Sequence, residues 1–250
     1  FLAYVPAHVR YYLDIFSGPT AEVDASVTIS RGPPVTGQAA DFEVSGGRVA
    51  FRHGRAAFAK FPYPFAEMRG TVEFDDTKIH FVEIQGVGPT GAKLNADVLI
   101  APLTDTARAD VNVRVTGAPV DELLLSSMPP DRRQILDVLL SRTRYDDLVR
   151  RGLIPAALPF QFGGLADITV NVQRPEGLDV DWATRISVRF DTIGLVPEPF
   201  PLPIIARNVE LTITDDKAVL ERGDFSGLAG GKATLQAVID TGYTTATPIQ

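Results

Sequence analysis

The sequence contains no cysteine, and this absence removes several kinds of structure and chemistry at once. Disulfide bonds, thiolate zinc sites and cysteine nucleophiles are all excluded. Positive charge is also scarce, because 24 Lys and Arg stand against 31 Asp and Glu, which gives a formal net charge of −7. No block of basic residues interrupts this acidic background. Since binding to a nucleic-acid backbone depends on clustered positive charge, we expect no nucleic-acid partner.

Long apolar runs are missing as well. No stretch reaches the roughly 18 consecutive apolar residues of a membrane-spanning helix, and no signal-peptide pattern is present. The apolar opening segment is interrupted by Pro6, His8 and Arg10, and the first residue is not Met. We therefore expect a fragment of a longer protein. Its 250 residues, 45% of them hydrophobic, are enough for a substantial folded core.

Strict two-residue alternation of apolar and polar side chains dominates the sequence. This alternation is typical of antiparallel strands with one apolar and one solvated face. Residues that favour turns separate the alternating segments. The predicted strands cover residues 21–30, 107–115, 167–173, 178–190 and 208–214, and the predicted turns cover 32–34, 46–47, 75–76, 175–177, 215–216 and 230–231.

Helical spacing replaces the alternation between Pro119 and Ile154. Asp131 is placed to cap a helix after two prolines, and Gly152 followed by Pro155 is a helix-ending pattern. The sequence thus predicts a first block of β-meanders over 1–118, a helical insert over 119–154 and a second block of β-meanders over 155–250.

A repeated phrase links the two blocks. Residues 61–76 are "FPYPFAEMRGTVEFDD", and residues 200–216 are "FPLPIIARNVELTITDD". Each phrase is followed by a strand pattern, a Gly-rich turn, a lysine (Lys93 or Lys232) and another strand pattern. The repeat predicts a proline-stiffened entry into a three-strand meander, as in a solenoid or an extended sheet.

Motifs that could carry chemistry have structural explanations. "GVGPTG" (86–91) matches a dinucleotide-binding fingerprint, but the following residues alternate as a strand, which favours a hairpin turn. His8, His53 and His80 lack metal-ligand spacing, so we expect them to be solvated.

The three Asp-Asp pairs could be an acid and a base or calcium ligands. Two of them, Asp75–Asp76 and Asp215–Asp216, fall where turns are needed, and we place the third, Asp146–Asp147, in the first turn of a helix. We expect no metal, no cofactor, no catalytic residue and no enzymatic activity.

Three segments together resemble the AsmA-like/TamB-like envelope proteins, a group with a repeating β-groove. These are "MRGTVEF" (68–74) after its proline-containing entry, the glycine turn before "AKLNADVLI" (92–100), and "DVNVRVTGAPVDELLLSSMPPDRRQILDVL" (110–139). The resemblance extends over about 34–240 and rests on loose patterns. It implies a long, twisted antiparallel sheet curled into one continuous groove, apolar inside, with the short helical insert at about 119–154.

The resemblance further implies a bridge between inner and outer membranes along which phospholipid acyl chains slide. The expected setting is the periplasm, with an inner-membrane anchor outside this chain and with membrane proteins as partners of the full-length protein. Alternation and repeat together select the groove-lining candidates Val27, Ile29, Val72, Phe74, Val111, Val113, Val170, Val188, Leu211 and Ile213.

Two alternatives remain open on the sequence alone. The same strands could build a closed β-sandwich, as in a binding or adhesion domain of a cell-surface protein. Scattered carboxylates could also belong to a carbohydrate hydrolase, which would need a pair of them converging in a cleft.

Overall fold

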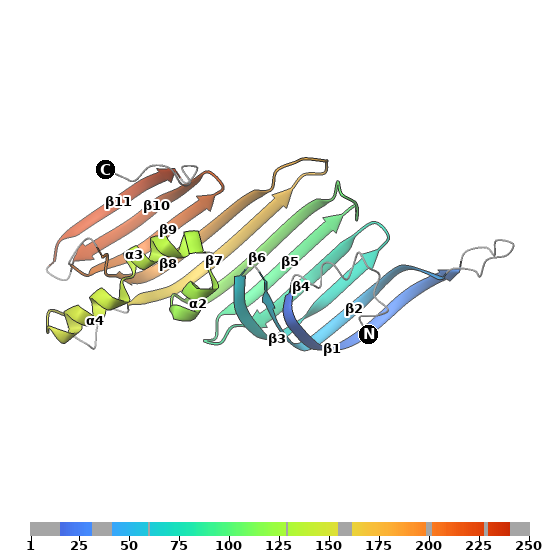
Figure 1. Ribbon diagram of the computed structural model, residues 1–250, viewed down its shortest axis with the longest axis horizontal. Coiled ribbons are helices and arrows are strands. Elements are labelled where there is room, and N and C mark those ends of the chain that lie inside the picture. Colours follow the sequence, from blue (N-terminus) through green and yellow to red (C-terminus); the bar gives the residue numbers. More distant parts are fainter. Residues whose placement is uncertain are drawn as a thin grey trace. The chain divides into compact units, whose positions relative to one another are not determined.

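The computed structural model describes residues 16–31, 42–59, 61–128, 130–154, 162–198, 202–227 and 230–240 (Figure 1). These residues form a mainly β structure with eleven antiparallel strands in one sheet, and the strand order follows the sequence from β1 to β11 without closing into a barrel. The strands are β1 (Phe16–Arg31), β2 (Phe42–Phe58), β3 (Phe61–Asp75), β4 (Ile79–Val87), β5 (Lys93–Ala101), β6 (Arg108–Pro119), β7 (Gly163–Arg174), β8 (Ala183–Leu195), β9 (Ile204–Thr214), β10 (Lys217–Gly227) and β11 (Lys232–Asp240). Helices α2 (Glu122–Ser127), α3 (Pro130–Leu139) and α4 (Arg142–Arg150) follow β6.

This arrangement confirms the predicted fold class. The sheet is antiparallel and built from sequential neighbours, and the three helices fall inside the predicted insert at 119–154. A closed sandwich would need two facing sheets, whereas the described strands belong to a single sheet. The architecture of that alternative is therefore not the observed one.

The chain divides into two compact units, which are described separately. The first unit comprises residues 1–114 and 171–183, and the second comprises 115–170 and 184–250. The first unit holds β1–β5, and the second holds the three helices and β8–β11, apart from the first residue of β8.

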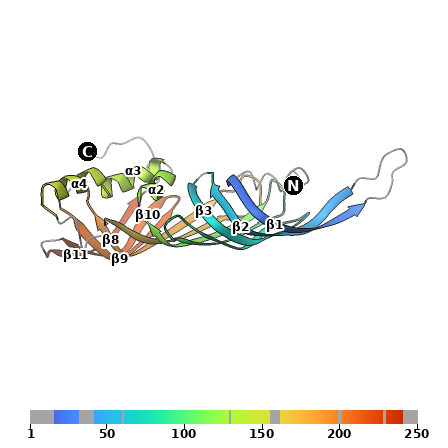
Figure 2. The same cartoon turned by 90° about the horizontal axis from the view of Figure 1, so that it is seen from below.

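Bulges bend three neighbouring strands of the first unit. His53 in β2, Glu67 in β3 and Glu83 in β4 have positive φ angles of 50°, 48° and 52°, and the pairing register shifts beside each of them. Each bulge inserts one residue and increases the local bend of its strand. Because the bulges occupy consecutive strands, the bend runs across the sheet, and β2 and β3 turn upward at one end in Figure 2. Two of these residues also meet directly, since Nδ1 of His53 lies 3.0 Å from Oε2 of Glu67.

The two glycine hairpins of the predicted repeat have the same hydrogen-bond pattern, but the predicted proline-stiffened entry at 61–64 is wrong, because Pro62 and Pro64 lie inside β3 (Phe61–Asp75). In the hairpin between β4 and β5, the N–H of Gly88 donates to Ala92 O (2.7 Å) and the N–H of Gly91 donates to Gly88 O (3.0 Å). In the hairpin between β10 and β11, Gly227 donates to Gly231 O (2.9 Å) and Gly230 donates to Gly227 O (3.0 Å). Gly91 and Gly230 have φ angles of +88° and +93°, which strongly favour glycine. "GVGPTG" is thus a hairpin turn, as predicted.

A bulge recurs at the equivalent place in the two meanders. The register of β4 with β5 shifts between Phe81 and Ile84. The register of β10 with β11 shifts between Leu220 and Gly223. In the β10–β11 hairpin, the glycines of the turn and the residues that flank the bulge lie 139 positions after their counterparts in the β4–β5 hairpin, for example Gly227 after Gly88 and Leu220 after Phe81. The two hairpins therefore share the position of the bulge in their strand pairing as well as the sequence pattern of their turns.

The Asp-Asp turns that join β3 to β4 and β9 to β10 are structural, as predicted. The carboxylate of Asp75 accepts hydrogen bonds from the backbone N–H groups of Thr77 (2.8 Å) and Lys78 (2.9 Å). The hydroxyl of Thr77, followed by these N–H groups, lowers the pKa of Asp75. In the second turn, the hydroxyl of Thr214 lowers the pKa of Asp216 in the same way.

Two sequence-based assignments of strands and turns are wrong. Gly46 and Gly47 do not form a turn but lie inside β2, where a Cβ on Gly47 would come within 2.8 Å of Cζ of Phe74. Glycine at position 47 leaves the space that the ring of Phe74 on the next strand occupies. The predicted strand beginning at Leu178 begins at Ala183 instead, and residues 175–182 form the connection from β7. The predicted turn at 32–34 lies outside the described residues.

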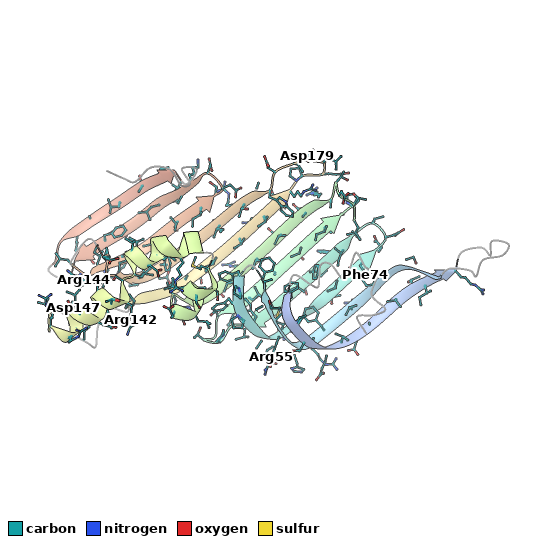
Figure 3. All side chains as sticks on the ribbon, in the orientation of Figure 1. Arg55, Phe74, Arg142, Arg144, Asp147 and Asp179 are labelled. Atoms are coloured by element: carbon teal, nitrogen blue, oxygen red, sulfur yellow. The ribbon has the colours of Figure 1, made fainter. Side chains whose placement is uncertain are left out.

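Two assignments within the helical insert are also wrong. Asp131 is not a cap, since α3 begins at Pro130. Asp146 and Asp147 lie in the middle of α4, beyond its first turn, and pair with arginines four positions away, Arg142 (3.2 Å) and Arg151 (3.4 Å). Ser141 caps this helix, and its hydroxyl accepts from the N–H of Arg144. Arg142 and Asp147 are labelled on α4 in Figure 3.

The helices of the second unit are anchored at the end of β8. Leu148 and Val149 of α4 pack with Val196 and Ile205. The backbone continues this attachment, because the N–H of Ser141 donates to Val196 O at 3.1 Å. The apolar side of α4 is thus part of the core of this unit, and Figure 2 shows the three helices along one side of the strands.

Candidate apolar binding face

Two rows of apolar side chains cross β1–β5 of the first unit. Directly opposed residues of neighbouring antiparallel strands point to the same face of a sheet. The first row follows the pairing Val27–Gly47–Phe74–Ile79–Ile100, and the second follows Ala25–Val49–Val72–Phe81–Val98. Neighbouring strands lie about 4.8 Å apart, so the four intervals make the rows roughly 19 Å wide. The structure therefore places the predicted residues Val27, Val72 and Phe74 together on one face.

The apolar face is buried at its centre (the closed part) and exposed to solvent at β1 (the open part). Ile79 is fully buried, and it packs in a cluster with Val72, Phe74 and Phe81. On β1, in contrast, Val27 is 50% exposed and Ile29 is 57% exposed. A large apolar side chain half in water is unremarkable alone, but Val27 belongs to the first of the two apolar rows. The open part at β1 is the candidate binding surface.

The opposite face of the same strands is polar and ion-paired. Arg52 of β2 donates to Glu22 (3.0 Å) and Asp24 (2.8 Å) of β1. The hydrogen bond to Asp24, followed by that to Glu22, raises the pKa of Arg52. Nε2 of His80 lies 3.1 Å from Oδ1 of Asp97. This contrast between the faces is the predicted one, and it leaves the apolar face as the side suited to an apolar ligand.

The histidines of the described chain are not gathered into a site. His53 is exposed and His80 is half-buried against its carboxylate partner, whereas His8 lies outside the described residues. No group of three or more His, Asp or Glu that could hold a metal ion occurs in the described part of the chain. Within that same part, none of the helices has the length and apolar character needed to cross a bilayer.

A shorter apolar row crosses the second unit. Val188 of β8 pairs with Leu211 of β9, which pairs with Leu220 of β10. Ile213 of β9 lies opposite Ile186. The predicted residues Val188, Leu211 and Ile213 are all half-buried in this sheet.

The remaining predicted residues lie on β1, β6 and β7. Val111 and Val113 are half-buried in β6, while the intervening Asn112 is exposed, so the predicted alternation holds there. Val170 is half-buried in β7. Ile29 lies near the end of β1, opposite Val44. Lining of a groove by these four residues stays a prediction.

An aromatic ladder on β3 was missed by the sequence-based selection. Phe61 and Tyr63 stack with ring centroids 6.1 Å apart, and Tyr63 meets Phe65 edge-on at 5.3 Å. Tyr63 is buried, and its hydroxyl finds no hydrogen-bond partner among the described residues. The aromatic residues alternate with Pro62 and Pro64. Aromatic residues at every second position are the signal for this ladder in the sequence, although the prolines between them also fit a stiff chain segment.

Comparisons with known proteins add no identification. No protein-family model, no curated protein and no solved structure matches this chain.

Proposed function

We propose that this chain is a non-enzymatic lipid-binding module of the cell envelope. In this proposal the apolar face of β1–β5 takes up phospholipid acyl chains, and the module is part of a periplasmic lipid-transfer bridge of the AsmA-like/TamB-like kind that serves outer-membrane biogenesis and envelope maintenance. Its other partners would be inner- and outer-membrane proteins, with an inner-membrane anchor outside this chain.

The observation that carries the proposal is the half-exposed end of the apolar rows. Val27 belongs to the same row as the buried Ile79, yet half of it remains in contact with water. Removing apolar surface from water is worth about 25 cal/mol per Å². An acyl chain lying on this face would gain that energy without any directional contact, and no catalytic group is required.

A matched pair of neighbouring residues provides the test. Val27 and Thr28 are both exposed on β1, and successive residues of a strand point to opposite faces. A photo-crosslinking amino acid at position 27 should label phospholipid in cells several-fold more strongly than one at position 28. Equal labelling at the two positions would refute the proposal. Leu211 with Thr212, and Val111 with Asn112, provide equivalent pairs elsewhere in the chain.

A charge placed on each face gives a second measurement. Native mass spectrometry of the gently purified chain should show bound phospholipid. Val27→Asp should reduce that bound fraction, because a carboxylate is costly to bury against acyl chains, and Thr28→Asp should not. A chain that carries no lipid would count against the proposal.

A further inference from the structure

The connection between β7 and β8 exposes two large apolar side chains. Leu178 is 68% exposed and Trp182 is 52% exposed, and Trp182 is the only tryptophan in the chain. The sequence pattern had assigned both to the apolar face of a strand. In the structure they lie outside β7 and β8 and present their surface to solvent.

Arg174 holds this connection in place. Its guanidinium donates hydrogen bonds to the carbonyl oxygens of Ala107, Asp105 (3.1 Å) and Gly177 (3.0 Å). The N–H of Gly177 donates to Thr106 O at 3.0 Å, which ties the connection to the turn between β5 and β6. A loop fixed in this way loses less conformational entropy when it binds a partner.

The same end of the first unit is strongly acidic. Strands that alternate in direction bring the turns after β3, β5 and β7 to one end of a sheet. Together these turns, residues 75–78, 102–107 and 175–182, hold six carboxylates and Lys78, and the guanidinium of Arg174 lies against two of the turns, which leaves four net negative charges when all are ionised. The carboxylates are Asp75, Asp76, Asp105, Glu176, Asp179 and Asp181. Asp179 is labelled at the connection in Figure 3.

We propose that the 175–182 connection docks a basic segment of a partner protein, in which Arg or Lys alternates with large apolar side chains. Tryptophan is enriched among residues that dominate binding energy at interfaces, and its ring attracts a cation placed over its face. The carboxylates select a positively charged partner and would repel an anionic membrane surface. This surface is separate from the apolar face of β1–β5, and the proposal does not depend on lipid binding.

Trp182 reports directly on its own environment, because it is the sole tryptophan. The whole chain is titrated with a synthetic peptide of alternating Arg and Leu, with its Glu–Leu counterpart, and with vesicles of phosphatidylcholine and phosphatidylglycerol. Only the Arg–Leu peptide should give a saturable blue shift of the emission. Raising the salt from about 0.01 M to about 1 M shortens the Debye length from about 30 Å to about 3 Å and should weaken this binding strongly.

Exposed leucines provide matched variants. Leu178→Ala should weaken peptide binding about tenfold, since it removes an apolar anchor. Leu202→Ala should leave binding unchanged, although Leu202 is 57% exposed, because it belongs to none of the three turns that form the proposed surface. Trp182→Ala, followed by calorimetry, should weaken binding about thirtyfold.

Several results would overturn the proposal. These are the absence of a saturable shift, an equal shift with the Glu–Leu peptide, and a shift with vesicles in place of the peptide. Equal affinities of the Leu178→Ala and Leu202→Ala variants would place the peptide elsewhere and would also overturn it. Unchanged far-ultraviolet circular dichroism of each variant controls for loss of folding.

Discussion

Substitution of Ile79 by alanine should reveal how much of the apolar face stabilises the fold. Ile79 is fully buried at the centre of the cluster formed with Val72, Phe74 and Phe81. Alanine lacks three carbon groups of isoleucine, and each is worth about 0.8 kcal/mol when buried. This gives a loss of about 2.4 kcal/mol, and the cavity left behind raises the expected loss to about 3 kcal/mol.

Val27→Ala is the matched substitution at the open end of the same row. It removes two carbon groups, worth about 1.6 kcal/mol if fully buried. Because Val27 is 50% exposed, we expect a loss of no more than about 0.8 kcal/mol. If the surface at Val27 is free, Val27→Ala should therefore lose about one quarter of the unfolding free energy that Ile79→Ala loses.

Urea unfolding of the whole chain measures both losses. Trp182 belongs to the first unit, so its emission follows the unfolding of the unit that contains Ile79 and Val27. With a denaturant slope of about 2 kcal/mol per M, Ile79→Ala should lower the midpoint by about 1.5 M and Val27→Ala by no more than about 0.4 M. Equal shifts for the two variants would refute the division of the face into closed and open parts.

Three further substitutions test separate features. Gly47→Val should lower the free energy of unfolding in urea by about 1–3 kcal/mol, because a side chain would overlap the ring of Phe74. Gly227→Ala should lower it by less than about 1 kcal/mol, because Gly227 has open space around it. Equal losses would contradict the steric argument. Asp75→Ala should lower the free energy of unfolding by about 1 kcal/mol at neutral pH. Because folding lowers the pKa of Asp75, the carboxylate stabilises the fold above its unfolded pKa near 3.9, and this stabilisation is lost as the pH falls through the folded pKa. A stability difference that persists in strong acid would contradict this. Arg174→Ala should lower the fluorescence anisotropy of Trp182 by freeing the connection, and an unchanged anisotropy would show that the arginine does not order it.

The strand architecture could be predicted because its signals are local. Alternation identified β1, β6, β7 and β9, and the repeated glycine turns located both hairpins. The helical insert was visible from its spacing, and the N-terminal residue of α2 follows Asp121, whose carboxylate caps the helix by accepting from Leu124 N–H at 3.0 Å. Each of these features depends on residues within a few positions of one another.

Features that depend on neighbouring strands could not be predicted. Nothing local marks His53, Glu67 and Glu83 as bulge positions, since none is a glycine and the register of adjacent strands decides the extra residue. The ring of Phe74 on the next strand leaves no space for a Cβ at Gly47, and this contact is not visible in the sequence around Gly47. Likewise, alternation between Leu178 and Trp182 satisfied a strand pattern, while the bonds of Arg174 to three carbonyl oxygens keep that segment outside the ladder.

The glycine turn and the bulge of the last hairpin recur at one interval of 139 residues, and this has a consequence for how such a chain can lengthen. The last hairpin of each meander contains both its turn and its bulge, so a duplicated copy would keep the pairing register of its own strands. Gene duplication in whole meanders would then preserve the inward and outward sides of every strand, whereas the gain or loss of a single codon within a strand would exchange them. Duplication of complete meanders therefore preserves the fold most readily. Chimaeras that exchange 61–101 with 200–240 should keep each side chain on its original face of the sheet.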